Sequence, residues 1–318
     1  MSKLLLKTSH FVFSFSLTFL LLKKFIPVLR KIIPVLPNER GMHNIVKPSS
    51  GGISFVLIYF LLALYQEFYL PIFSMPMAII GFIDDKYNLS KFFRLLSQCL
   101  SLIIIIIYLN NDPNNIVNQI NYLGYFWHVI LIFIGVAIIN FINFMDGIDG
   151  LICGSMIMIF ITLNGQVHYL IPIIGTLSAF LYFNWYPSKI FMGDTGSLFL
   201  GTYLVSIMYS SSSNVISFFK ICLLCSPLLM DALICIIRRY LNNQNIFNAH
   251  KSHLYQRLVS NGIKHSTVSL IYILSIALLS IIYLHSSILD LFLGTVLVFL
   301  TGVFIDKKYA LDFNKTIY

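Results

Sequence analysis

Long apolar runs follow one another along almost the whole chain, with short polar segments between them. A helix that crosses a bilayer needs about 20 apolar residues, somewhat fewer where its ends are indistinct. The pattern predicts an all-α integral membrane protein with about eleven transmembrane helices, in one polytopic domain over residues 1–318. We expect the helices near 4–22, 51–66, 69–83, 92–109, 123–141, 148–164, 168–183, 197–211, 215–237, 266–284 and 287–304.

The composition agrees with a membrane protein. Charged residues make up 10% of the 318 residues and hydrophobic residues 58%, whereas a soluble domain carries about 25% charged residues. The N-terminal apolar run lacks a small-residue cleavage site and is followed by more apolar sequence, so we expect an uncleaved first helix. The Cys222-x-x-Cys225 spacing lies inside an apolar run, without a second ligand pair, and packing is its simpler interpretation.

The basic residues predict how the helices are oriented. If the first helix runs from outside to inside, 18 of the 21 Lys and Arg residues fall in the inner segments 23–50, 84–94, 184–196, 238–265 and 305–318. This bias follows the positive-inside rule, so the N-terminus is expected outside and the C-terminus in the cytoplasm. The net charge of +9 then belongs to a cytoplasmic face, and we expect no nucleic-acid partner.

Aspartates gather at the expected cytoplasmic helix ends, namely Asp84, Asp85, Asp146, Asp149, Asp194 and Asp231. A buried, unpartnered carboxylate costs several kcal/mol at the least. We therefore expect these groups near water and on one face of the protein. A proton relay or ion pathway more often places ionisable groups near mid-membrane.

In GFIDDKYNLSKFFRLLSQ (81–98), the adjacent Asp84 and Asp85 point in different directions on a helix. One carboxylate can then meet a metal ion or a phosphate while the other pairs with a cation, and Lys91 and Arg94 follow closely. A helix end whose charges neutralise one another is the alternative.

Asn140, Asn143, Asp146 and Asp149 recur at every third residue, so neighbours in the series share a helix face. Their amide and carboxylate oxygens suit a divalent cation, or the hydroxyl groups and amide of a sugar nucleotide. Capping of helix ends by Asn and Asp is the alternative.

The stretch FNWYPSKIFMGDTGSLFLG (183–201) contains Asn184 and places Asp194 between two glycines, at the mouth of a helix expected from Ser197. Backbone amides there can hold phosphate oxygens, and Asp194 can hold a bridging Mg²⁺. The stretch is not a P-loop, which requires GxxxxGK[ST]. Helix capping is again the alternative.

The largest inner loop follows Asp231 and is basic, with Arg238, Arg239, His250, Lys251, His253 and Arg257. It suits a polyanion such as pyrophosphate, or anionic lipid headgroups. No carboxylate or cysteine is near the two histidines in sequence, so we expect them to hydrogen-bond phosphate rather than bind a metal.

Together these motifs predict a cytoplasm-facing, metal-assisted site for phosphoryl transfer between a soluble nucleotide and a membrane lipid. Its loops are expected near 36–52, 84–94, 140–150, 184–197 and 238–265. A membrane transporter with a basic cytoplasmic vestibule is the alternative of another class. It predicts charges or helix breaks in mid-span in two matching halves, and the sequence shows no such halves.

The order of the motifs resembles a known family. GFIDD, NFINFMDGIDGL, NWYPSKIFMGDTGSLFLG and HKSHLYQRL, with the early PNERGMH, resemble the polyprenyl-phosphate N-acetylhexosamine-1-phosphate transferases, the WecA/MraY superfamily of glycosyltransferase family 4. The resemblance implies transfer of a sugar 1-phosphate from a UDP-sugar, UDP-GlcNAc or a related UDP-N-acetyl amino sugar, to undecaprenyl phosphate, with release of UMP. It implies the bacterial cytoplasmic membrane and the first membrane step of a surface polysaccharide such as O-antigen or teichoic acid.

The resemblance also implies a requirement for Mg²⁺, or Mn²⁺ in its place. We predict Asp194 and Asp149 as metal ligands, and Asp84, Asp85, Asp146 and Asp149 as catalytic residues. The predicted substrate-binding residues are Asn140, Asn143, Lys91, Arg94, Asn184, Arg238, Arg239, His250, His253 and Arg257. A homodimer is a further expectation.

The His250-Lys251-Ser252-His253 stretch departs from the H-x-H-H pattern of WecA-like enzymes and from the histidine run of the peptidoglycan enzymes. It looks like the O-antigen-initiating branch, and phospho-MurNAc-pentapeptide transfer is the alternative within the family. The second pKa of a phosphate monoester is near 6, so the acceptor is already mostly dianionic. We therefore expect direct attack by the lipid phosphate, with Asp84 as base or nucleophile the minor alternative.

Overall fold

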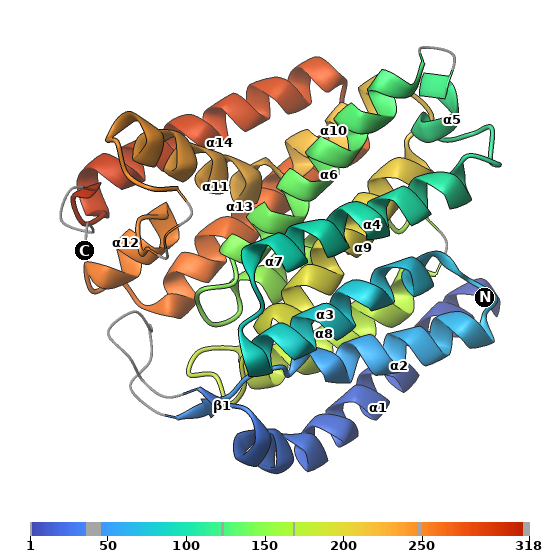
Figure 1. Ribbon diagram of the computed structural model, residues 1–318, viewed down its shortest axis with the longest axis horizontal. Coiled ribbons are helices and arrows are strands. Elements are labelled where there is room, and N and C mark those ends of the chain that lie inside the picture. Colours follow the sequence, from blue (N-terminus) through green and yellow to red (C-terminus); the bar gives the residue numbers. More distant parts are fainter. Residues whose placement is uncertain are drawn as a thin grey trace.

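The computed structural model describes residues 2–35, 46–121, 124–167, 169–246, 248 and 250–313, which form a bundle of helices (Figure 1). Its helices are α1 (Ser2–Ile32), α2 (Gly52–Tyr65), η1 (Leu70–Ser74, a 3-10 helix), α3 (Met75–Tyr87), α4 (Lys91–Leu109), α5 (Ile116–Asn121), α6 (Tyr125–Phe144), α7 (Leu151–Leu163), α8 (Leu170–Asn184), α9 (Gly193–Ser211), α10 (Val215–Leu224), α11 (Ser226–Leu241), α12 (Leu254–Ser260), α13 (His265–His285) and α14 (Ile288–Tyr309).

Two short strands, β1 (Pro34–Val35) and β2 (Lys47–Pro48), pair antiparallel with Val35 opposite Lys47. They join the end of α1 to the segment that enters α2. Residues 36–45, which include the PNERGMH motif of the expected early loop, lie outside the described residues.

Helices lie where the apolar runs predicted them. Five of the described helices are long and apolar enough to cross a bilayer, namely α1 from Leu5 onward, α4, α6, α13 and α14. The bent pair α10 and α11 would make a sixth crossing, and α2, α7 and α8 are apolar but shorter. The chain is therefore an all-α membrane protein, and the number of eleven crossings stays a prediction.

The prediction of one helix over 215–237 is wrong, because this segment forms two helices. α10 and α11 meet at Cys225 with an angle of 80° between them. Pro227 stands in the first turn of α11, and a proline there has no N–H to continue the hydrogen bonds of the preceding helix. The apolar run continues through the break, so hydropathy alone did not reveal it.

Capping side chains define where the helices α4 and α14 begin. Ser90 accepts a hydrogen bond from the Phe93 amide at the start of α4, at 3.3 Å. Ser287 and Asp290 form a reciprocal capping box at the start of α14. Such caps satisfy amides that have no partner within the helix.

Helix α9 is the centre of the bundle and is buried along almost its whole length. It packs against α2, α3, α4 and α6. A Cβ added at Gly81 of α3 would lie 2.3 Å from the carbonyl oxygen of Asp194, so only glycine allows this close approach. The approach brings the end of α3, with its two aspartates, beside the first turn of α9.

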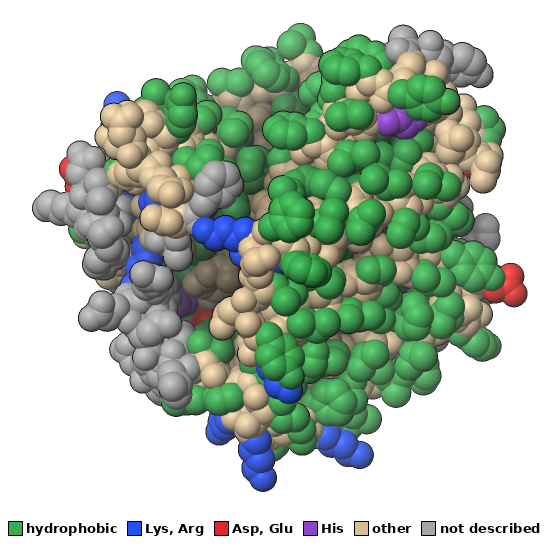
Figure 2. Space-filling view, in the orientation of Figure 1, with side chains coloured by type: hydrophobic (Ala, Val, Ile, Leu, Met, Phe, Trp, Pro, Cys, Tyr) green, Lys and Arg blue, Asp and Glu red, His purple; other side chains and the backbone are tan. Residues whose placement is uncertain are grey.

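The loops that carry the acidic and basic motifs lie at one end of the bundle, where α3, α6 and α8 end and α4 and α9 begin (Figure 1). α1 begins at the opposite end and α14 ends beside the motif loops (Figure 1). Over α3, α4 and α6 the surface is mostly hydrophobic (Figure 2), as expected for a surface that faces lipid.

Candidate active site

Three helix ends bring Asp84, Arg94 and Asp194 together. Arg94 Nη1 in α4 donates to Asp84 Oδ2 at 3.0 Å and to Asp194 Oδ2 at 3.2 Å. The second oxygen of Asp84 accepts from the Leu89 amide at 2.6 Å. One guanidinium therefore joins a buried carboxylate of α3 to the partly exposed carboxylate of α9.

Asp85 holds the N-terminus of α9. Its carboxylate accepts hydrogen bonds from the amides of Asp194 and Thr195 at 2.9 and 3.2 Å, and from the hydroxyls of Thr195 and Ser50 at 2.8 and 2.6 Å. A negative charge at a helix N-terminus is also favoured by the helix dipole. The first amides of α9, which the sequence offered for phosphate, are therefore occupied by a side chain of the protein.

A glycine is required where Asp85 meets α9. Gly193 has a φ of +72°, and a Cβ there would lie 2.4 Å from Asp85 Oδ2. Both the backbone conformation and the space exclude a side chain. The Gly before Asp194 in the FMGD motif thus allows a carboxylate to reach the helix end.

The asparagines expected on one face of a helix have different partners. Asn143 Nδ2 donates to Asp194 Oδ1 and to Ser197 Oγ, both at 2.9 Å. Asn140 instead exchanges hydrogen bonds with the amide of Gln98 in α4. Asn143 therefore belongs to the Asp194 cluster, and Asn140 links α6 to α4.

Asp146 lies in the turn between α6 and α7 and is the least satisfied carboxylate of the site. Among the described residues, its side chain has no hydrogen-bond or ion-pair partner. Burial raises its pKa well above the ordinary value, and the negative charges of Asp194, Asp85 and Asp149 raise it further. A cation beside Asp146 would offset both effects.

Asp149 is buried in a second, neighbouring group. Its two oxygens accept from the Ser188 amide at 3.0 Å and from the Ser188 hydroxyl at 2.8 Å. Lys47 Nζ lies 3.6 Å from Asp149 Oδ2 and donates to Ser188 Oγ at 2.9 Å, and His265 Nδ1 lies 3.8 Å away. Asp149 thus fixes the position of a lysine that enters from β2.

Asn184 connects two loops of the site. Its side chain accepts from the Gly150 amide at 3.1 Å and donates to the carbonyl of Ile190 at 3.0 Å. Gly150 has a φ of +79°, which starts α7 directly after the turn that carries Asp146. Asn184 is buried, so its contacts support the loops rather than face the solvent.

The arginines of the late loop that were predicted to bind substrate have partners within the protein itself. Arg238 and Arg257 both pair with Asp306 of α14, and Arg257 also donates to the carbonyls of Ser252 and Leu311. Arg239 is buried and donates to the Asn245 carbonyl at 2.7 Å. These arginines hold the C-terminal part of the bundle together, whereas Lys91 is exposed at the start of α4.

The two histidines of the same loop have pKa values shifted in opposite directions. Burial and the nearby charges of His253 and Arg239 lower the pKa of His250 to about 3. Burial lowers the pKa of His253 as well, but its contacts with Asp231 and Cys235 outweigh this effect and raise it to about 9. Tyr255, two residues on, donates to the Phe144 carbonyl at 2.8 Å and so ties this loop to the end of α6.

The surface at this end of the bundle is hollowed beside the turn between α6 and α7 (Figure 2). Lys or Arg side chains lie above the hollow, and acidic and His side chains are visible at its edge (Figure 2). An opening with both charge types suits an anionic substrate that arrives together with a cation.

Sequence reasoning missed several members of the site. Lys47, Ser50, Ser188 and His265 touch the predicted aspartates. Lys47 and Ser50 belong to the early polar loop, and a cation there between two apolar segments was the available signal. Ser188 lies in the expected loop 184–197 but was not singled out there, and His265 had no local signal. Both meet Asp149 only through the packing of helices.

The fold and the site define a class, namely helical membrane enzymes with an acidic centre at the helix ends. The profile of Glycosyl transferase family 4 matches residues 68–212. The chain is 30% identical over 294 residues to a probable undecaprenyl-phosphate N-acetylglucosaminyl 1-phosphate transferase of Bacillus subtilis, which covers 84% of this chain and 81% of the relative.

Two further relatives have names that specify related activities. A decaprenyl-phosphate N-acetylglucosaminephosphotransferase of Mycobacterium tuberculosis is 24% identical over 311 residues, covering 77% of this chain and 73% of the relative. A phospho-N-acetylmuramoyl-pentapeptide-transferase of Prochlorococcus marinus is 33% identical over 226 residues, covering 59% and 61%. The chain belongs to glycosyl transferase family 4, the family of polyprenyl-phosphate sugar-1-phosphate transferases, and is a phosphotransferase of this family.

Proposed function

We propose that the protein transfers an N-acetylhexosamine 1-phosphate from a UDP-sugar to undecaprenyl phosphate, with release of UMP. The donor would be UDP-GlcNAc or a related UDP-N-acetyl amino sugar. The relatives from Bacillus subtilis and Mycobacterium tuberculosis support this reaction, since both names specify a polyprenyl phosphate and N-acetylglucosamine. The reaction would open the synthesis of a surface polysaccharide in the bacterial cytoplasmic membrane.

One observation carries the proposal, namely the carboxylate group around Asp146. Its side chain is unpartnered in the described part of the chain and faces the charges of Asp85, Asp149 and Asp194. Without a cation, a proton on Asp146 relieves this repulsion, which is what its raised pKa expresses, and a bound cation would take the place of that proton. A phosphotransferase that brings Mg²⁺ and a diphosphate to the same place needs such a centre.

The donor atoms fit Mg²⁺, which prefers carboxylate and other oxygen ligands. Asp146 and Asp194 are the best-placed ligands, because the first is unpartnered and the second has a side chain that is 30% exposed. Both oxygens of Asp149 already accept from Ser188, so Asp149 as a ligand stays a prediction. When bound, the cation would neutralise charge on the phosphates of the donor.

The chain's own residues would position the two phosphates. An oxygen of the lipid phosphate attacks the phosphorus that carries the sugar, the bond to the bridging oxygen breaks, and UMP leaves with that oxygen. Arg94 pairs with Asp84 and Asp194, and Lys47 lies beside Asp149. Both cations would lower the repulsion between the anionic reactants. Both oxygens of Asp84 accept hydrogen bonds, which supports direct attack rather than a covalent Asp84 intermediate.

The proposed orientation places this site at the cytoplasmic surface. The motif loops share one end of the bundle (Figure 1), and the bias of Lys and Arg supports a cytoplasmic position for that end. UDP-sugars are soluble anions, whereas the acceptor's polyprenyl chain remains in the bilayer. A site at the helix ends, beside a hydrophobic surface, gives each substrate access from its own phase.

The experiment is to measure UMP release by purified protein in detergent, with undecaprenyl phosphate, Mg²⁺ and a panel of UDP-N-acetyl sugars. We expect release with one donor, dependence on the lipid, and no release after EDTA is added. UDP-MurNAc-pentapeptide belongs in the panel because of the Prochlorococcus relative, and activity with it alone would favour the alternative donor. No release with any donor, from folded protein, would overturn the proposal.

A further inference from the structure

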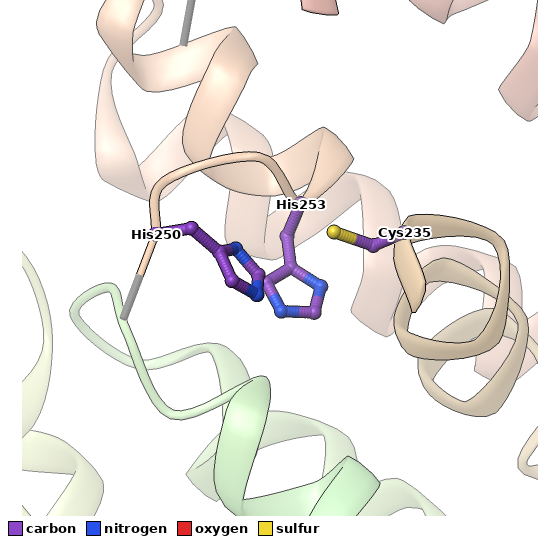
Figure 3. Close-up of side chains that lie close together, drawn as sticks. All are labelled: Cys235, His250 and His253. Atoms are coloured by element: carbon purple, nitrogen blue, oxygen red, sulfur yellow. The ribbon is translucent and has the colours of Figure 1, made fainter. Parts of the chain in front are cut away.

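Outside the carboxylate group, Cys235 of α11 lies beside His250 and His253 of the following loop (Figure 3). The cysteine sulfur and one ring nitrogen of each histidine lie within 4.8 Å of one another. Cys235 and His253 are buried, and His250 is half-buried. No sequence pattern connects the positions of these three side chains, because α11 and the loop meet only in the folded protein.

We propose that Cys235, His250 and His253 bind a Zn²⁺-like transition metal that fastens the loop to α11. Thiolate and imidazole are ligands that Zn²⁺ prefers, whereas Mg²⁺ takes oxygen ligands. The site would therefore be chemically distinct from the proposed magnesium centre. It does not depend on the proposed transferase function.

The spacing is close to that of a metal site. Tetrahedral Zn²⁺ with normal bond lengths holds sulfur and nitrogen ligands about 3.4 to 3.6 Å apart. The three ligand atoms lie at most 4.8 Å apart. The largest of these distances would therefore have to shorten by about 1 Å on metal binding. Small rotations of Cys235 and His250 supply such a shift, since His250 lies on a loop and is not enclosed.

Asp231 supplies the second shell that a histidine ligand usually has. It lies one turn before Cys235 on α11, and its Oδ1 is 3.8 Å from Nδ1 of His253. Both carboxylate oxygens are already held, by the amides of Leu254 and Tyr255 and by the hydroxyl of Tyr272. A carboxylate beside Nδ1 leaves Nε2 to face a metal, as in carboxylate–histidine–zinc groups.

One ring nitrogen of His253, Nδ1, is buried without a hydrogen-bond partner among the described residues. A metal on the other nitrogen would fix the tautomer with the proton on Nδ1, directed at Asp231. Three protein ligands leave a fourth position open, on the side where His250 is partly accessible.

The test measures metal binding without donor or acceptor. Full-length protein in detergent, with excess Mg²⁺ to fill oxygen-ligand sites, is dialysed against limited Zn²⁺ and its metal content measured by mass spectrometry. We expect about one Zn²⁺ per chain, and at least a tenfold lower content in Cys235→Ser and His250→Gln. Cys99→Ser, the same change at a cysteine in α4, is the matched control and should keep the metal.

Co²⁺ provides a second readout that reports the ligands. Thiolate coordination gives a near-ultraviolet charge-transfer band, which should appear with the wild type and be absent with Cys235→Ser. His250→Gln guards against misfolding, because this half-buried loop residue can change without disturbing a helix. Wild type that binds no more Zn²⁺ than Cys235→Ser, or Co²⁺ binding without the thiolate band, would overturn the proposal.

Discussion

Replacing Asp85 by Ala separates a positioning role from a catalytic one. The carboxylate accepts four hydrogen bonds of 3.2 Å or less, two from amides of α9 and two from hydroxyls of Thr195 and Ser50. Each hydrogen bond to a charged group contributes about 1.5 to 3 kcal/mol. Water molecules that enter in place of the carboxylate, and rotation of the two hydroxyl groups toward other acceptors, recover part of this free energy. We therefore expect a loss of about 3 to 6 kcal/mol in the free energy of unfolding.

The assay is thermal unfolding in detergent, followed by the fluorescence of the two tryptophans. A loss of this size lowers the midpoint by on the order of 10 °C. Since membrane proteins of this size unfold irreversibly, all variants are heated at one scan rate. Asp85→Asn keeps one acceptor oxygen, so its midpoint of thermal unfolding should lie between those of Asp85→Ala and the wild type.

Asp194→Asn is the matched control for this experiment. It keeps the shape of the side chain, and Asn143 can still donate to the remaining oxygen. The lost hydrogen bond from Arg94 is offset by the relieved repulsion from Asp84 and Asp85. The midpoint of Asp194→Asn should stay within about 2 °C of the wild type. Unfolding of Asp85→Ala at the wild-type midpoint, with turnover lost, would refute the reasoning and assign Asp85 to the chemistry itself.

Four further outcomes test the site. Asp194→Asn should abolish UMP release at saturating Mg²⁺, and near wild-type turnover would contradict the metal assignment; EDTA should stop the wild type, with Mg²⁺ or Mn²⁺ restoring it. Lys47→Ala should raise the KM for the UDP-sugar about tenfold, the equivalent of one charged hydrogen bond of about 1.5 kcal/mol, with Lys47→Arg recovering part of the loss. His253→Ala removes a buried side chain beside Asp231, so we expect the late loop to shift and donor binding to weaken or the preferred sugar to change. An unchanged donor profile and rate would remove the late loop from the donor site.

The sequence by itself determined where most of the helices are and which loops carry the chemistry. Apolar runs become helices because the backbone cannot leave its polar groups unpaired in lipid, and carboxylates stand at helix ends because burial without partners costs too much. The proximity of Asp84, Asp194 and Asn143 was therefore expected, because their motifs all lie at helix ends on the same membrane surface.

Only the tertiary structure decided what each of these residues does. Asp84 and Asp85 are neighbours in sequence, yet one pairs with Arg94 and the other holds the amides of α9. The predicted substrate-binding Arg257 instead pairs with Asp306 near the end of the chain. These partners are set by which helices pack together, and hydrophobic periodicity records only that a helix face is buried, without specifying against what.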